Sequence, residues 1–421
     1  MEKLLEFFYG IQDEDLLRDA HTFSKSCVPY CEVAISGEED TIVGQILSGV
    51  WAVFVDGMDQ CVLIDQRTYP QRTTSEPDQD KSFRGSRDGF VETMVFNAAL
   101  IRRRIRSPRL CVEHLEVGET SRTDVAVCYF EGRADPELVN TVRERIAQAR
   151  VDALTMNQES LAELLVRKRW YNPFPKFKFT ERPDAAAAQI LEGDVVVLVD
   201  NSPAAIILPT TLFDVMEEAN DYYFPPITGS YLRLVRFFTT FLTTFLTPVW
   251  LLLIQEPERV PGWLEFILME EPAQVPPLLQ LLILELAIDG LKLAALNTPN
   301  ILTTSFSMIG AIILGDFAVQ SGWFSAEVML YMAVVAIANY NQPNLELGYA
   351  LKFMRLILLV ATGLLGLWGF VGGAALLFLV LVSNRTISGQ CYLYPLVPFN
   401  GGELKKKLLR IGSGPPERKG A

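Results

Sequence analysis

Hydrophobic and polar positions are arranged differently in the two parts of the chain. Up to about residue 231, short apolar runs alternate with charged stretches, whereas long apolar segments joined by short polar loops fill residues 232–382. A helix needs about 20 consecutive apolar residues to cross a bilayer. The pattern therefore predicts a soluble α/β amino-terminal region, then an all-α polytopic membrane domain at residues 227–390 and a basic cytoplasmic tail at 391–421.

The soluble region contains an internal repeat. Residues 46–57 align without a gap on residues 190–201, and the copies continue into apolar runs at 61–64 and 205–208. In each copy Asp-Gly or Asp-Asn stands between apolar β-branched runs, and these pairs supply the positive φ angles of a hairpin turn. We therefore expect two related α/β subdomains, at residues 1–109 and 110–226, each with this hairpin.

Periodicity predicts the other elements of this region. Asp135 followed by Pro136 has the chemistry of a helix N-terminus. The predicted elements are amphipathic helices within residues 2–27, strands at 110–116 and 124–130, and helices at 90–106, 136–149 and 158–169.

Five apolar segments are candidates for membrane crossing. Residues 326–338 are short for a crossing and are expected to be re-entrant or tilted. Residues 353–382 are long enough for one steeply tilted helix. The remaining candidates are residues 234–254, 277–296 and 302–320.

Charge predicts the orientation. Lys405, Lys406 and Lys407 favour a cytoplasmic tail, because positive residues are enriched in cytoplasmic segments. The first residues begin no apolar run long enough for a signal peptide, so the amino-terminal region is expected in the cytoplasm as well. Two ends on one side require an even number of crossings, and we expect four.

Composition excludes several classes of function. The net charge of −13 argues against nucleic-acid binding, which needs a basic surface. The six cysteines are scattered, and only two histidines are present, so a zinc site at His21, Cys27 and Cys31 is disfavoured. The sequence contains no GxxxxGK[ST], GxSxG or HExxH motif. We therefore predict no catalytic residues, no metal site and no cofactor, and we do not expect an enzyme.

Ionisable residues within the apolar segments are the first functional candidates. Glu285, Asp289 and Lys292 are spaced to lie on one face of a helix, where the lysine can neutralise the acids. Charges inside a membrane are costly and often line a polar path, but an ion-paired helix interface explains them equally well. Both interpretations stay open. Asp316 is a further polar candidate.

Small and hydroxyl side chains form two further patterns. Thr240 and Thr244 belong to a threonine-rich side of the first span that could hydrate a pore, although helix packing is favoured. Gly363, Gly366 and Gly369 recur every third residue and predict a ridge for close approach of another helix, from the same chain or from a neighbouring subunit.

A basic cluster ends the predicted helix at residues 90–106. Arg102 and Arg103, with two neighbouring arginines, could bind an anion or an acidic face of a partner. A solvated helix end that complements the helix dipole is the favoured alternative.

Several stretches together resemble a known family. They are Arg84-Gly85-Ser86-Arg87-Asp88-Gly89-Phe90-Val91-Glu92, the motif Asp221-Tyr222-Tyr223-Phe224-Pro225-Pro226, and the apolar segment at residues 310–319. With these stretches the chain resembles the A-subunit family of spore germination proteins, the GerA family, and within it the stage V sporulation protein AF type more than the nutrient-receptor subunits. The resemblance marks Arg84 and Arg87 as interface candidates.

The resemblance carries functional implications. It implies residence in the inner membrane of the dormant spore, assembly into a ring-like homo-oligomer, and a second germination membrane protein as partner. It also implies a role in the release of monovalent cations. The leading hypothesis is a subunit of an oligomeric ion-conducting complex. The alternatives are a non-conducting membrane scaffold for germination proteins and a carboxylate-coupled secondary transporter, although no repeat among the spans supports the transporter.

Overall fold

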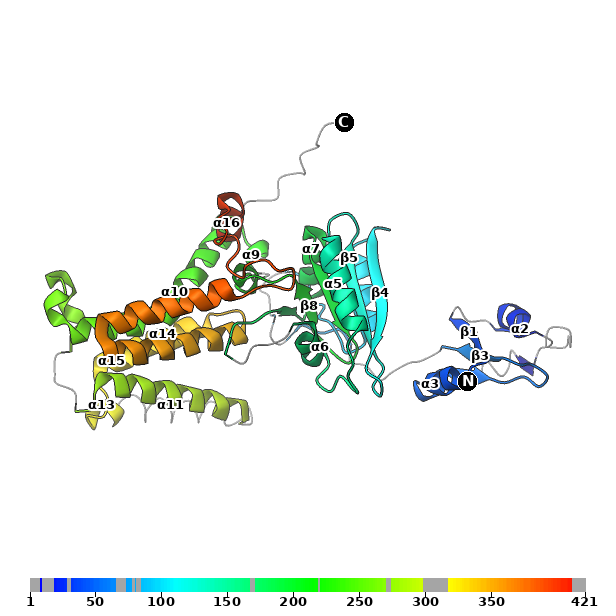
Figure 1. Ribbon diagram of the computed structural model, residues 1–421, viewed down its shortest axis with the longest axis horizontal. Coiled ribbons are helices and arrows are strands. Elements are labelled where there is room, and N and C mark those ends of the chain that lie inside the picture. Colours follow the sequence, from blue (N-terminus) through cyan, green and yellow to red (C-terminus); the bar gives the residue numbers. More distant parts are fainter. Residues whose placement is uncertain are drawn as a thin grey trace, which may run out of the picture. The chain divides into compact units, whose positions relative to one another are not determined.

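The structure is a computed structural model of the 421-residue chain. It divides into two compact units, Met1–Arg72 and Thr73–Ala421 (Figure 1). Four of the sequence candidates, Cys31, Arg84, Asp316 and most of the segment 302–320, lie outside the described residues. The structure describes residues 8–9, 19–28, 32–65, 73–77, 80, 85–166, 171–218, 220–269, 274–297 and 317–410.

The first unit contains a small antiparallel sheet with strand order β1-β3-β2. The side chains of Phe23, Cys27, Val62 and Ile64 are buried together between the sheet and helix α2. Cys27 is therefore a buried thiol in an apolar core. The elements are α2 (Ala20–Cys27), β1 (Val33–Ser36), α3 (Glu39–Leu47), β2 (Trp51–Val53) and β3 (Cys61–Ile64).

The second unit begins with a five-stranded antiparallel sheet, strand order β4-β5-β7-β8-β6. Successive residues of a strand point to opposite faces, so a sheet covered on both sides must be apolar at every position. Strand β7 shows this, since all five of its residues are buried. The strands are β4 (Leu110–Val117), β5 (Thr123–Phe130), β6 (Lys178–Thr180), β7 (Val195–Val199) and β8 (Ala205–Leu208).

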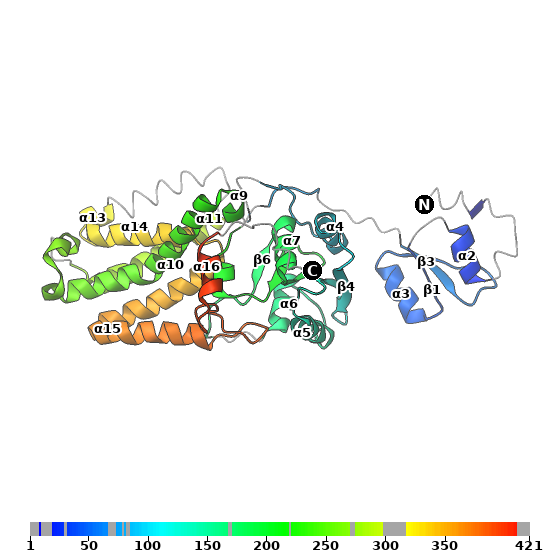
Figure 2. The same cartoon turned by 90° about the horizontal axis from the view of Figure 1, so that it is seen from above.

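Helices cover both faces of this sheet (Figure 2). Val125 and Val127 point to the face covered by α5 and α6, whereas Ala126 and Cys128 point to the face covered by α4 and α7. Helix α4, placed by the sequence in the first subdomain, thus packs on the second sheet. The predicted cap is confirmed, because the Asp135 side chain accepts from the amide of Glu137. The helices are α4 (Met94–Arg104), α5 (Pro136–Ala147), α6 (Gln158–Leu165) and α7 (Pro183–Glu192).

The predicted repeated hairpin is confirmed in both sheets. Strands β2 and β3 pair antiparallel in one copy, and β7 and β8 pair antiparallel in the other. Gly57 and Asn201 have the expected positive φ angles, 87° and 60°. The structure shows that the repeat also includes a helix before each hairpin. This helix ends near a glycine of positive φ, which is Gly49 in the first copy and Gly193 in the second. Helices α3 and α7 were not predicted. In each copy one apolar run covers both the end of the helix and the start of the strand, and such a run shows neither the helical nor the strand period clearly.

Long apolar helices make up the rest of the second unit. Helices α10, α11, α14 and α15 pack side by side in Figures 1 and 2. Short segments, α8 (Leu212–Val215) and α9 (Asn220–Tyr223), connect the sheet to α10. The helical elements are α10 (Pro226–Gln255), η2 (Pro257–Arg259), η3 (Gly262–Ile267), α11 (Pro277–Asn297), α13 (Ala318–Gln320), α14 (Ala326–Tyr340), α15 (Leu345–Ser383) and α16 (Gly401–Leu408).

Helix α15 corrects the expectation of one tilted helix at residues 353–382. Its 39 residues are interrupted at Gly366, whose φ of 57° and ψ of −135° are not helical. A Cβ on Gly373 would lie 3.4 Å from the Cα of Leu358, although a straight helix would separate these residues by roughly 22 Å. The two arms of α15 therefore fold back on each other (Figure 2). Hydropathy did not reveal the break, because the turn itself is apolar.

Substitution of Gly366 tests this hairpin. An alanine at this φ and ψ is strained, at a cost of about 1–3 kcal/mol, although among the described residues only Glu256 Oε1, at 3.9 Å, lies near its added Cβ. We expect Gly366→Ala to lower the thermal midpoint of the detergent-solubilised protein, measured by tryptophan fluorescence. Gly372→Ala is the matched control, since nothing lies within 4 Å of its Cβ position. Equal midpoints for the two variants would contradict the hairpin.

Candidate functional site

Four charged side chains meet inside the helical bundle. Glu285 and Asp289 lie one turn apart on α11 and face Lys352 and Arg355 on the first arm of α15. Arg355 Nε donates to Glu285 Oε1 at 2.7 Å, and Lys352 Nζ lies 3.4 Å from Glu285 Oε2. Lys352 also forms an ion pair with Asp289, and Arg355 Nη1 donates to the carbonyl of Thr243 on α10 at 2.6 Å. The cluster thus joins three helices.

Three of the four side chains in this cluster are almost dry, whereas the Asp289 side chain is 27% exposed. Glu285, Lys352 and Arg355 are exposed by only 3%, 4% and 2%. The cavity beside them has a volume of about 10 Å³, enough for about one water molecule. Because a buried charge without a partner is very costly, the two acids and two bases must neutralise one another. The geometry fits the ion-paired interface that the sequence left open, and it closes the bundle at this level.

Lys292 does not complete the predicted triad. Its ammonium lies 4.6 Å from the ring centroid of Tyr340 and 5.8 Å from that of Tyr349, over the aromatic faces. Helical spacing correctly placed Lys292 near the acids, but spacing along one helix cannot show that another helix supplies closer cations. The signal that was missed is Arg355 within the last apolar segment, with Lys352 at its edge. Two acids in an apolar bundle require bases elsewhere in the bundle.

The threonine candidates bond to their own helix. Thr240 Oγ1 donates to the carbonyl of Arg236 at 2.8 Å, and Thr244 Oγ1 donates to the carbonyl of Thr240 at 3.1 Å. Both bonds follow the back-bonding pattern of packed helices, which favours packing over a hydrated pore. By contrast, the fully buried hydroxyls of Thr243 and Thr247 have no hydrogen-bond partner among the residues that the structure describes.

The glycine candidates serve contacts within the chain. A Cβ on Gly363 would lie 2.6 Å from Leu278 Cδ2, so this glycine admits α11 against α15. Gly366 makes the turn, and Gly369 lies against Ala361 of the opposite arm. The ridge therefore builds the hairpin and its contact with α11. An oligomer role for these glycines remains a proposal.

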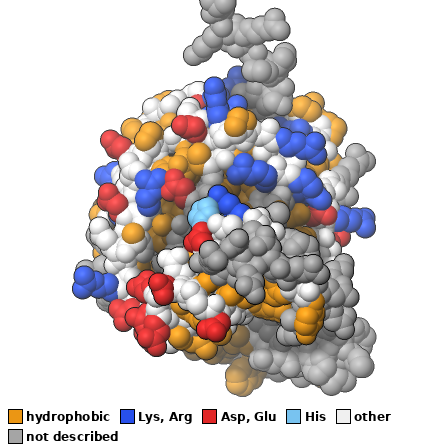
Figure 3. Space-filling view, turned by 90° about the vertical axis from the view of Figure 1, so that its right-hand side faces the viewer, with side chains coloured by type: hydrophobic (Ala, Val, Ile, Leu, Met, Phe, Trp, Pro, Cys, Tyr) orange, Lys and Arg blue, Asp and Glu red, His pale blue; other side chains and the backbone are white. Residues whose placement is uncertain are grey.

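The arginine candidates hold a loop of the same chain. Arg102 Nη2 donates to the carbonyl of Leu110 at 3.3 Å, and Arg103 forms an ion pair with Asp88. Arg87 is exposed. The face in Figure 3 carries basic and acidic side chains mixed among hydrophobic ones. These contacts favour a structural role for the end of α4.

Two stretches that carry the family resemblance meet in space. Gly85 passes so close to the ring of Tyr223 that a Cβ there would overlap it. Arg182, which is 1% exposed, donates to the carbonyl of Ser86 at 3.2 Å and binds Asp184. Asp184 in turn accepts a hydrogen bond from the Tyr223 hydroxyl. These contacts fix the loop that precedes α4 to the segment that leads into α10.

A second charge cluster joins the sheet to α10. Arg233 Nη2 donates to Glu217 Oε1 at 2.8 Å. Arg236 donates to both carboxylate oxygens of Asp221, at 2.8 and 3.1 Å, and to Glu218 Oε2 at 2.7 Å. Asp221 is fully buried. The first turns of α10 are thus locked to the segment that connects them to the sheet.

Lysines complete this junction. Lys407 on α16 forms ion pairs with Asp214, at 2.5 Å, and with Glu217, at 3.5 Å. Burial would raise the pKa of Glu217, but the positive charges of Lys407, Lys178 and Arg233 outweigh it and lower the pKa to about 2. Glu217 therefore remains ionised and paired.

The bundle cluster predicts non-additive stability. Arg355→Gln leaves Glu285 with one cation, and breaking a buried pair costs about 3–5 kcal/mol. We expect Arg355→Gln to destabilise the detergent-solubilised protein strongly, and the double variant Glu285→Gln/Arg355→Gln to lose less than the sum of the single variants. Chemical unfolding measures these losses, with Lys292→Gln as the control outside the ion pairs. Strictly additive losses would show that the pair is not coupled.

The junction predicts a pH dependence. Because the pKa of Glu217 falls from 4.5 to about 2 on folding, its contribution is fully present above about pH 4.5 and is lost as the pH falls towards 2. The size is on the order of 3 kcal/mol. We expect Glu217→Gln to lower the free energy of unfolding at pH 7 and to flatten its dependence on pH in this acid range. An unchanged slope between pH 4.5 and 2 would contradict the pairing.

Comparison with known proteins assigns the chain to a family. Residues 1–414 match the family described as Bacillus/Clostridium GerA spore germination protein. Stage V sporulation protein AF of Bacillus subtilis (strain 168) is 43% identical over 371 residues, which cover 88% of this chain and 75% of that protein. Spore germination protein KA of the same organism is 28% identical over 407 residues, which cover 95% of this chain and 74% of that protein.

A solved structure is similar to part of the chain. It is the N-terminal domain of the A subunit of the Bacillus megaterium spore germinant receptor GerK3, which is 34% identical. The match covers 28% of this chain and 93% of that domain, with a TM-score of 0.24. Together with the match to residues 1–414, the relatives place the protein in spore germination or sporulation. This chain belongs to the GerA family of spore germination proteins.

Proposed function

We propose that this chain is the membrane subunit of an oligomeric complex that conducts monovalent cations during spore germination. The membrane placement is supported by α10 and α15, whose most apolar windows have mean hydropathies of 1.8 and 2.3. Large apolar side chains on these helices are exposed, among them Phe238 by 60%, Leu364 by 72% and Trp368 by 80%. Such exposure is unfavourable in water but suits lipid.

The orientation is supported by contacts between the two ends of the helical part. Arg233 on α10 donates to the carbonyl of Lys406 on α16 at 3.1 Å, and the amide of Arg410 donates to Ser230 Oγ at 3.0 Å. The basic tail and the α/β region therefore lie at the same end of the bundle. By the positive-inside rule this end is the cytoplasmic one, the spore core if the chain lies in the inner spore membrane. Because both ends lie on the same side of the membrane, the number of crossings is even. The two arms of α15 account for two of them.

The buried charge cluster is the observation that carries the conducting role. Carboxylates inside a membrane are rare because their desolvation is costly. Where they occur, they often mark a path for ions or protons. Among the described residues, the cavity of about 10 Å³ beside Glu285 is too small to form a passage through one chain. We therefore place the path at this cluster in an open state of a ring-like homo-oligomer, in which Lys352 and Arg355 separate from the acids. In that state Glu285 and Asp289 face the ions.

A non-conducting scaffold is the second candidate. It is favoured by the same four charges, since they neutralise one another and a paired interface needs no transport role. In this case the membrane part would anchor the α/β region, which would recruit a second germination membrane protein. Conduction and anchoring differ in one measurable property, the flux of ions.

Ion flux tests the proposal. The full-length chain is reconstituted into liposomes, and potassium efflux is compared among the native chain, Glu285→Gln and Asp289→Asn. We expect flux from the native oligomer and a change in its rate or selectivity in either variant, roughly tenfold for a change of about 1.4 kcal/mol in the barrier. Glu403→Gln is the control, since it removes a charge of the surface pair with Lys406. Light scattering checks that all variants form the same oligomer.

Two outcomes would count against the conducting role. No flux from a correctly assembled native oligomer would transfer the assignment to the scaffold. Flux that is identical in the native chain and in both variants would show that ions do not pass the cluster.

A further inference from the structure

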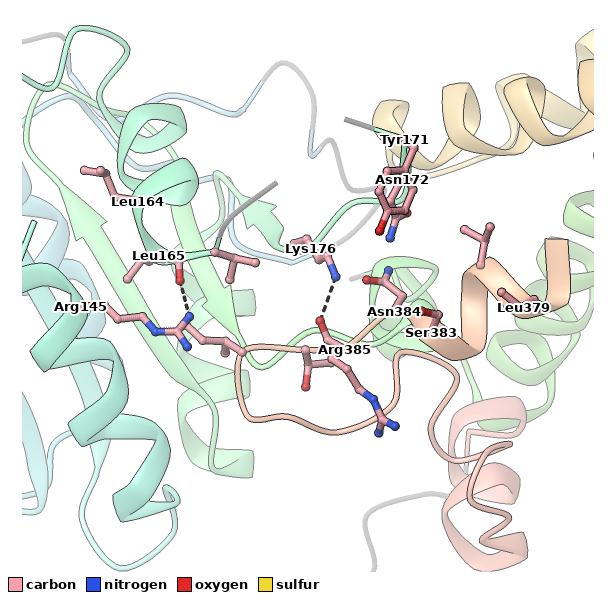
Figure 4. A pocket seen from close by; sticks show the side chains of 14 residues that line it. Arg145, Leu164, Leu165, Tyr171, Asn172, Lys176, Leu379, Ser383, Asn384 and Arg385 are labelled. Atoms are coloured by element: carbon pink, nitrogen blue, oxygen red, sulfur yellow. Dashed lines mark hydrogen bonds between the residues drawn. The ribbon is translucent and has the colours of Figure 1, made fainter. Parts of the chain in front are cut away.

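A large cavity lies where the α/β region meets the end of α15 (Figure 4). Its volume is about 1070 Å³, far larger than the space beside the buried charge cluster. One wall comes from α5, α6 and residues 171–176, and the other from the last turn of α15 and the loop that follows it. The ion-conducting proposal makes no use of this cavity.

The charged groups of the cavity are all positive. Arg145, Lys176 and Arg385 line it, and no Asp or Glu is among its described lining residues. This composition is unusual in a chain with 50 acidic and 37 basic residues. Figure 4 shows Arg145 reaching from α5 on one side and Arg385 from the loop on the other. Arg145 Nη1 donates to the carbonyl of Leu165, and Lys176 Nζ donates to the carbonyl of Arg385 at 2.9 Å (Figure 4). Arginine and lysine bind phosphate through charge-assisted hydrogen bonds.

Asn384 supplies an independent observation. It lines the cavity and is only 2% exposed, yet neither its Oδ1 nor its Nδ2 has a hydrogen-bond partner among the described residues. A buried polar group without a partner costs about 1–3 kcal/mol, so such a group calls for a ligand or another explanation. An amide offers one donor group and one acceptor. It therefore fits a ligand that carries both a phosphate oxygen and a hydroxyl.

The apolar side of the cavity indicates where the ligand comes from. Leu379 and Val380 on α15 line the cavity, and Leu379 is 63% exposed. Tyr171, 53% exposed, lies on the opposite wall, and aromatic rings of this kind favour the depth of lipid headgroups. A ligand with a polar anionic head and apolar chains would satisfy both sides. Basic pockets at the cytoplasmic ends of membrane helices bind anionic headgroups in this way.

We propose that this cavity binds the phosphoglycerol headgroup of an anionic lipid, with its acyl chains along α15. Arg145 and Arg385 hold the phosphate, and Asn384 bonds to the phosphate and to the hydroxyl of the head. The inference rests on the membrane placement proposed above but not on ion conduction. A bound lipid would tie the α/β region to the second arm of α15.

Competition between two lipids tests the site. Full-length protein in neutral detergent is offered equimolar phosphatidylglycerol and phosphatidylcholine, and the lipids retained are counted by native mass spectrometry. We expect a preference for phosphatidylglycerol, and a loss of roughly tenfold in its affinity for each arginine removed in Arg145→Gln and Arg385→Gln. Both arginines are exposed, so their variants should fold. Lys405→Gln, which removes an exposed charge outside the cavity, is the matched control.

Three results would overturn the proposal. One is the absence of a preference between the lipids, and another is an equal loss in Lys405→Gln and in the arginine variants. The third concerns the source of the phosphate: if millimolar inorganic phosphate displaces the lipid and depends on the same arginines, the site binds a free anion. Flotation with phosphatidylcholine vesicles separates this proposal from the membrane placement. A chain that floats without preferring phosphatidylglycerol keeps the membrane placement and loses the lipid site.

Discussion

The ion pairs of Arg233 and Arg236 with Glu217, Glu218 and Asp221 are the constraint on which the second unit depends. Guanidinium groups in the first turns of a long apolar helix need partners, and the short segment between sheet and helix supplies them. Because Asp221 is fully buried, the pairs cannot separate without exposing charge to an apolar surrounding. The α/β region and the start of α10 are therefore expected to move as one body.

The helical bundle is likewise held together by buried ion pairs. Its charges are paired between helices that are far apart in sequence, so each pair also fixes which helices are neighbours. Glu285 holds α11 to α15, and Arg355 holds α15 to α10 through the carbonyl of Thr243. In an apolar medium helices gain little from the hydrophobic effect when they associate, which gives such polar contacts more weight. A conformational change that separates these helices would have to exchange these partners for others.

The sequence predicted the elements that depend on local periodicity and missed those that depend on tertiary partners. Strands β4 and β5 and helix α5 follow from alternation and from the Asp135 cap. The turn at Gly366 could not be found, because its neighbours are as apolar as a continuous helix and glycine is common in membrane helices. Glu285 and Asp289, the acids that the sequence singled out, do pair with other charged side chains, but these are not the partner that helical spacing predicted. Lys292 was the nearest cation in sequence, whereas Lys352 and Arg355 are the nearest in space.

The docking of α16 has a consequence for the order in which the protein matures. Lys407 follows its partner Asp214 by 193 residues. The ribosome therefore synthesises the whole helical bundle after Asp214 and before Lys407. Until α16 emerges, Glu217 lacks the lysine whose charge contributes most to keeping it ionised. The junction is thus completed only after the bundle has been synthesised. A nascent chain that stalls within α15 would therefore carry a junction in which Asp214 and Glu217 lack the positive charge of Lys407.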